Sequence, residues 1–111
     1  MANTFKSKTF DGSSTNADTL MTVYTVPGST TTIVLGLTLC NITTSNIEIT
    51  TTLTKNSGDN VHIAKLAAVP AKSALEIMTG NKYVLETSDI LKVKSNVANS
   101  LDTTLSIMEI T

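Results

Sequence analysis

The sequence has no Trp, no Arg and a single Cys, and each shortage excludes a class of protein. Because its eight Lys+Arg residues are all Lys, the chain lacks the bidentate forks that Arg offers to phosphate and guanine. A net charge of −1 creates no long-range field that would attract polyanions or anionic membranes. We therefore expect no nucleic-acid partner and no membrane partner.

The lone Cys40 excludes an intrachain disulfide. Residues 1–6 lack the apolar stretch of a secretory signal. The most apolar run, residues 33–40, is interrupted by Gly36 and Thr38 and is far too short to span a bilayer. We expect a soluble protein that is synthesised in a cytoplasm.

Thr and Ser take the place that charged residues fill in most soluble domains. Charged residues make up 15% of the chain, against roughly 25% in an ordinary domain. Thr is β-branched and suits a pleated strand, where its hydroxyl gives a neutral outer surface. The 111 residues, 41% of them hydrophobic, fit one domain with one core.

Alternation of apolar and polar residues dominates the chain, and no stretch has a convincing helical period. The clearest strand is residues 47–54, and residues 32–40 are predicted to be a central strand because both of their faces are largely uncharged. The first strand is predicted to turn inward Ile47, Ile49, Thr51 and Leu53, with Glu48, Thr50, Thr52 and Thr54 outward. One face of the second strand comprises Ile33, Leu35, Leu37 and Leu39.

Turn signals such as Pro27-Gly28 recur roughly every 8–12 residues, a spacing typical of sandwiches and barrels. The sequence therefore predicts an all-β fold, an antiparallel β-sandwich of jelly-roll or immunoglobulin-like connectivity with about eight strands. The other predicted strands are residues 19–26, 61–69, 73–78, 82–86, 90–94 and 101–110, with turns at 56–60, 79–81 and 87–89 and a loop at 11–16. In the last strand Leu105 and Ile107 are predicted to face inward.

Residues 17–111 are predicted to form the sandwich domain, and residues 1–16 an N-terminal arm or an edge strand. Phe5 and Phe10 flank a polar stretch and need a surface to bury against, which favours an arm that reaches a neighbour. The predicted protein-interface residues are Phe5, Phe10, Thr50, Thr52 and Thr54.

No catalytic, cofactor or metal motif is recognisable, so we predict that the protein is not an enzyme. His62 alternates with apolar neighbours in an outward position, and Cys40 has the setting of a buried, inert thiol. One His and one Cys are too few for a zinc site. Residues 11–18 lack the order of acidic ligands that a calcium loop requires.

Two other chemistries depend on side chains that meet only in space. A glycosidase pair would have to come from Glu48, Glu76 and Glu86, each equally well explained as a solvated strand residue. A carbohydrate-binding sandwich would stack sugars on aromatic rings, for which only Tyr24 and Tyr83 are candidates.

Four segments occur together and in order: TVYTVPG at 22–28, LTLCN at 37–41, YVLETSD at 83–89 and LSIMEIT at 105–111. In this combination the chain resembles small virion structural proteins of tailed bacteriophages, particularly marine and cyanobacterial ones. The resemblance spans most of residues 19–111 and departs from the usual pattern at Ser88, where Gly is usual.

The resemblance implies a structural protein of the virion without catalytic residues, most simply a capsid decoration (cement) protein that binds the capsid lattice as a homo-oligomer. Its partners would be the major capsid protein or neck and tail proteins, and it would be synthesised in the host cytoplasm. One alternative is a neck, tail or fibre accessory protein. An alternative of another class is a carbohydrate- or ligand-binding module.

Overall fold

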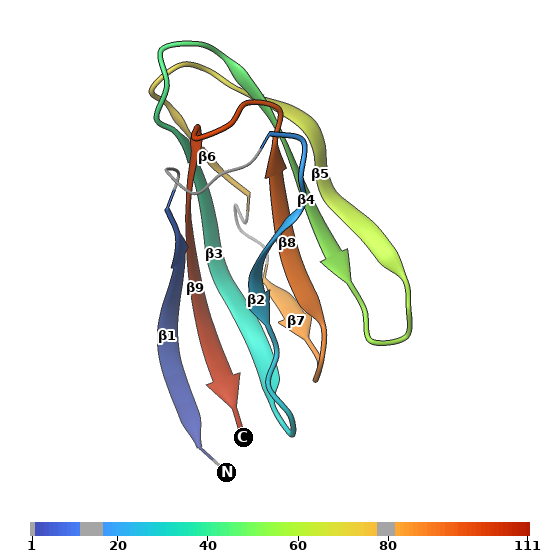
Figure 1. The fold of residues 1–111 in the computed structure, drawn as a ribbon. Helices are drawn as coiled ribbons and strands as arrows, with labels where there is room; N and C mark the ends of the chain where they lie inside the picture. Colours follow the sequence, from blue (N-terminus) through green and yellow to red (C-terminus); the bar gives the residue numbers. More distant parts are fainter. Residues whose placement is uncertain (1, 12–16, 78–81) are drawn as a thin grey trace.

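The computed structural model describes residues 2–11, 17–77 and 82–111. All of the regular secondary structure in these ranges is β-strand (Figure 1). Two antiparallel sheets pack face to face there, so the predicted all-β sandwich is confirmed. The nine strands of the described ranges are β1 (Asn3–Phe10), β2 (Met21–Thr25), β3 (Thr31–Asn41), β4 (Ile47–Thr54), β5 (Asn60–Val69), β6 (Ala74–Glu76), β7 (Tyr83–Leu85), β8 (Ile90–Ser95) and β9 (Leu101–Ile110).

The sheets are built from strands that are distant in sequence. The first sheet has the order β1-β9-β3-β6, with β7 also paired to β3. The second sheet has the order β2-β8-β4-β5. In Figure 1 β1 runs along one edge of the sandwich, and the two chain ends lie side by side below it.

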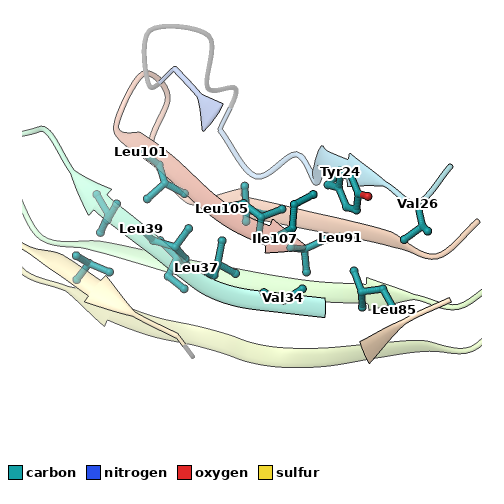
Figure 2. Close-up of a cluster of buried hydrophobic side chains, with 14 residues drawn as sticks. Tyr24, Val26, Val34, Leu37, Leu39, Leu85, Leu91, Leu101, Leu105 and Ile107 are labelled. Atoms are coloured by element: carbon teal, nitrogen blue, oxygen red, sulfur yellow. The ribbon is translucent and has the colours of Figure 1, made fainter. Parts of the chain in front are cut away.

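Aliphatic side chains from both sheets fill the space between them (Figure 2). The predicted inward residues Leu37, Ile49 and Leu105 are fully buried. Burying a side chain of this size contributes roughly 1.5–3 kcal/mol, so this layer is the main source of stability. Its fully buried members also include Val34, Leu39, Ile47, Leu85, Leu91, Val93, Leu101 and Ile107.

The register of β3 against β9 shifts between Val34 and Gly36, and this shift corrects one prediction. Ile33 and Leu35 were expected to share a face with Leu37, but Val34 is buried instead and both are only half-buried. An extra residue in one strand moves the following side chains to the other face. The Glu76 carboxylate accepts the N–H of Leu37 at 3.0 Å, which gives the backbone a partner beside the bulge.

The N-terminal segment forms the edge strand β1 and not the arm that the sequence favoured. All eight residues pair with β9 in unbroken register, from Asn3 opposite Ile110 to Phe10 opposite Thr103. This ladder gives the backbone partners that a free arm would have to find in water. Residues 12–16 of the predicted loop 11–16, Met78 of the predicted strand 73–78 and the predicted turn at 79–81 lie outside the described residues.

Candidate functional site

An apolar row crosses the outer face of the first sheet. Phe5 of β1 lies opposite Met108 of β9, Met108 opposite Ile33 of β3, and Ile33 opposite Val84 of β7. Directly opposite residues of an antiparallel pair share a face, and the adjacent Ile107 is fully buried, so the row faces away from the core. Phe5 is 72% exposed and Val84 58%, while Met108 and Ile33 are half-buried.

At one end the apolar row reaches the edge strand β1, which is largely exposed to solvent. Along β1 every residue is exposed except Phe10, which is half-buried. A contiguous apolar surface at a sheet edge is typical of a protein-binding site. We therefore take β1 together with the apolar row as the candidate functional surface.

Behind β1, a buried carboxylate connects both sheets. Glu109 lies on the inward face of β9 and is only 5% exposed. One carboxylate oxygen lies 2.8 Å from Nζ of Lys6, and the other accepts a hydrogen bond from the Tyr24 hydroxyl. That hydroxyl also lies 2.8 Å from Oγ1 of Thr32. The cluster therefore links β2 of the second sheet to β1, β3 and β9 of the first.

Electrostatics fix the protonation states in this cluster. The hydrogen bond from Lys6, and then that from Tyr24, lower the pKa of Glu109 despite its burial. Burial, followed by the hydrogen bond to Glu109, raises the pKa of Tyr24 to about 12. At neutral pH the Glu109 carboxylate is therefore charged and the Tyr24 phenol protonated. Neither group has a pKa near neutrality, where a general base needs it. The arrangement supports a structural clamp.

A second polar cluster joins the loop after β4 to the turn between β7 and β8. Asp89 is fully buried and accepts hydrogen bonds from Nζ of Lys55 at 2.5 Å and from the N–H groups of Asn56 at 2.9 Å and Glu86 at 2.8 Å. Lys55 also lies 3.1 Å from the exposed Glu86 carboxylate. Beside this cluster is a cavity of about 440 Å³ lined by Lys55, Asn56, Ser57, Glu86, Thr87 and Asp89.

The charge of Lys55 is already compensated. Hydrogen bonds to Asp89 and then to Glu86 raise the pKa of Lys55. Burial acts to raise the pKa of Asp89, but Lys55 and the two N–H groups outweigh burial and lower it. Because the amine is protonated and paired with two carboxylates, it offers neither a nucleophile nor an anion site. The cluster holds the two turns together.

The backbone of the adjacent turn has the conformation for which a glycine would be usual. Ser88 has a φ of 72°, in the left-handed region that Gly enters most readily. The Asp89 N–H donates to the Glu86 carbonyl at 3.0 Å and closes this turn. Ser in place of the usual Gly at position 88 is therefore compatible with the hairpin.

The predicted interface residues differ in their exposure. Phe5 begins the apolar row, whereas Phe10 lines a second cavity of about 330 Å³ at the other end of β1. Thr54 is half-buried, and its hydroxyl donates to the Asn60 side-chain oxygen at 3.0 Å. Of the exposed and half-buried candidates, only Phe5 lies in the apolar row.

Thr50 and Thr52 were predicted to face a partner, and this prediction is wrong because they are 3% and 1% exposed. Their strand lies inside the second sheet, where Thr50 is opposite Lys94 and Thr52 opposite Lys92. Long side chains on a neighbouring strand screen a short one from water. The Thr50 hydroxyl in addition accepts the N–H of Leu66 at 3.2 Å.

The residues considered for catalysis are not brought together. Cys40 lies in β3 of the first sheet and is half-buried, while His62 is exposed in β5 of the second. Glu76 is bonded to β3 and Glu86 to Lys55, whereas Glu48 lies in the second sheet. Among the described residues, no three His, Cys, Asp or Glu side chains are grouped so as to hold a metal ion.

The aromatic candidates for sugar stacking are poorly placed. Tyr24 is 5% exposed and its hydroxyl is engaged inside the sandwich, and Tyr83 is half-buried against the core. Neither ring stands free on the surface as a platform.

Sequence reasoning missed Glu109 and the apolar row. Leu105, Ile107 and Glu109 occupy every second position of one strand, and this spacing alone would have placed the Glu109 carboxylate inside. The row depends on the register between four strands, for which the sequence carries no signal.

Neither the protein-family models nor the curated proteins include a match to this chain. In the described part of the chain, no helix has the length and apolar character needed to cross a membrane.

Proposed function

We propose that this protein is a structural subunit of a bacteriophage virion, a capsid decoration protein that binds the capsid lattice. The observation that carries the proposal is the exposed edge strand β1 beside the apolar row, because this surface suits contact with another protein. The resemblance of four strand-and-turn segments to phage virion proteins supplies the biological setting.

The surface and its support suit attachment to a repetitive particle. Each contact can be weak when many copies bind the same lattice, since multivalency raises the overall affinity. The Lys6–Glu109 ion pair behind β1 keeps the edge strand fixed to the sandwich, and the Tyr24 hydroxyl holds the same carboxylate, so little ordering entropy is lost on binding. Preorganised β1 therefore favours docking as a rigid unit.

Mass spectrometry of purified virions from the phage that encodes the chain tests the proposal. We expect the protein in intact particles, and its absence from them would refute a virion role. Copy number then separates decoration from a neck, tail or fibre position. Decoration requires on the order of hundreds of copies, whereas a tail part requires tens or fewer, because each follows the symmetry of its site.

A further inference from the structure

We infer that the free edge of β1 is a docking site for an extended acidic segment of a partner protein, which adds to the first sheet as another strand. This inference rests on the proposed protein-binding role and names its surface and the partner's chemistry. Backbone hydrogen bonding, an apolar contact and charge each support it.

The backbone of β1 presents a regular line of unused hydrogen-bonding groups. Ala2 and Thr111 exchange both of their backbone hydrogen bonds, at 3.0 and 2.9 Å. In an antiparallel ladder such pairs recur at every second residue, so Thr4, Lys6, Lys8 and Phe10 direct their N–H and C=O groups toward β9. The intervening residues direct theirs to the free edge, where no described strand pairs: Asn3, Phe5, Ser7 and Thr9.

The edge is also regular enough for another strand to pair with it. The register with β9 runs from Asn3 to Phe10 without a bulge, and the segment contains no Pro. Bulges and prolines are two devices by which proteins block such edges. Strand addition to an open edge draws its affinity from main-chain hydrogen bonds and its specificity from alternate side chains.

The outer face of β1 supplies the apolar contact. A residue placed opposite Phe5 by an added strand would point to the same face as Phe5. It would extend the row of Phe5, Met108, Ile33 and Val84 by one position and cover a ring that is now 72% exposed. The partner segment therefore carries an apolar residue at that position.

The inner face of β1 supplies the charge that selects the partner. Lys6 is paired with Glu109, and Lys8 lies on the same face two residues further along. Lys8 forms no close ion pair with a described residue, and the one carboxylate on which its charge acts, Glu109, is already bound by Lys6. A carboxylate opposite Lys8 would compensate it, and cross-strand pairs of opposite charge are stabilising.

The same lysines argue against a second copy of this chain as the occupant. Two β1 strands that pair antiparallel about Ser7 would place Lys6 of each copy opposite Lys8 of the other. Like charges directly opposite are destabilising, and edge lysines are a known protection against self-association. In this register the edge therefore discriminates against its own copies and in favour of an acidic strand.

Nuclear magnetic resonance with two peptide probes tests the inference. The probes are a short blocked peptide of alternating Val and Glu and the same peptide with Lys in place of Glu, added to isotope-labelled protein at neutral pH. We expect the acidic peptide to bind at least about tenfold more tightly, a difference of about 1.4 kcal/mol. Its amide shifts should be largest at Phe5, Ser7 and Thr9, whose N–H groups face the edge.

A matched pair of variants separates the edge from the side chain. Ser7→Pro removes an N–H that faces the free edge while the ladder to β9 remains, because Pro is tolerated where its missing donor faces solvent. Both variants remove the Ser7 hydroxyl, but Ser7→Ala keeps the N–H. We expect Ser7→Pro to lose at least about tenfold in affinity and Ser7→Ala to bind as the parent does. Lys8→Glu should reverse the preference between the two peptides.

Four results would overturn the inference: equal binding of both peptides, no shifts up to about 1 mM peptide, shifts confined to another strand, or full affinity in Ser7→Pro. Sedimentation that shows a dimer abolished by Ser7→Pro would assign the edge to a second copy and also overturn the inference.

The failure of this inference can be distinguished from the failure of the virion role. If the protein occurs in virions but does not bind the acidic peptide, this inference fails and the virion role stands. If it binds the peptide but is absent from particles, the virion role fails and the docking edge stands.

Discussion

The Tyr24 hydroxyl donates to the Glu109 carboxylate from the opposite sheet, across 85 residues of sequence. The carboxylate also holds Lys6 of the edge strand, so one buried group fixes the spacing of the sheets and anchors β1. Because a buried polar group without a partner is costly, each member of the cluster depends on the others.

Removing the Tyr24 hydroxyl should destabilise the sandwich. Tyr24→Phe loses the bonds to Glu109 and Thr32, so we expect the free energy of unfolding to fall by roughly 1–3 kcal/mol in urea titrations. Tyr83→Phe is the control, and its hydroxyl should matter by less than about 0.5 kcal/mol. Equal effects of the two substitutions would contradict the clamp.

The ionisation of Tyr24 can be observed directly. In a Tyr83→Phe background Tyr24 is the only tyrosine, and its absorbance at alkaline pH should titrate with a pKa of about 12. Because this pKa lies above the ordinary value of 10.0, the stability contributed by Tyr24 is full below pH 10.0 and is lost as the pH rises toward 12. A midpoint near 10.0 in the folded protein would contradict the buried bond to Glu109.

Asp89 and Glu86 bind the same ammonium and should differ widely in importance. Asp89→Asn leaves a buried site with one charge missing, and we expect a loss of roughly 2–4 kcal/mol in the free energy of unfolding. Glu86→Gln changes an exposed partner and should cost less than about 1 kcal/mol. Denaturant midpoints compare the two, and a reversed order would refute the anchoring role of Asp89.

Acid should weaken the protein through two lowered carboxyl pKa values. Asp89 and Glu109 have pKa values below their ordinary 3.8 and 4.5, so their stabilisation is present above those values and is lost as the pH falls through the folded ones. Thermal unfolding followed from pH 6 to pH 2 should show this loss. An Asp89→Asn, Glu109→Gln double variant, less stable at pH 6, should lose less as the pH falls. A parallel decline in both proteins would contradict the assignment.

Two buried threonines should respond oppositely to Val. The Thr103 hydroxyl has no hydrogen-bond partner within the described residues, so Thr103→Val should leave stability unchanged or raise it by up to about 1 kcal/mol. The Thr32 hydroxyl meets that of Tyr24, and Thr32→Val should lower stability by about 1 kcal/mol. Calorimetry of the two variants checks the sign, and a loss in both would indicate a partner for Thr103.

Much of the fold follows from alternation alone. The bounds of β4 match the predicted residues 47–54, and Ile47 and Ile49 are buried as expected. A strand with one apolar face has a single register that buries it, so its sequence is informative. The same reasoning located β9 and the burial of Leu105.

The remaining features depend on neighbours that a single strand does not specify. Leu35 turned from the core because of a bulge beside which the Leu37 N–H donates to the Glu76 carboxylate, 39 residues away from Leu37. Thr52 is covered because its strand became central, and Glu109 lies inside because Lys6 and Tyr24 compensate it. In each case a contact made in space outweighed the local pattern.

The position of β9 between β1 and β3 also sets the order in which the molecule can assemble. During translation β1 leaves the ribosome before the other described strands, yet the strand it pairs with spans residues 101–110. The four strands of the second sheet have all been translated by residue 95. We therefore expect the second sheet to pair first during translation, while β1 waits for its partner as a nascent chain that chaperones can recognise.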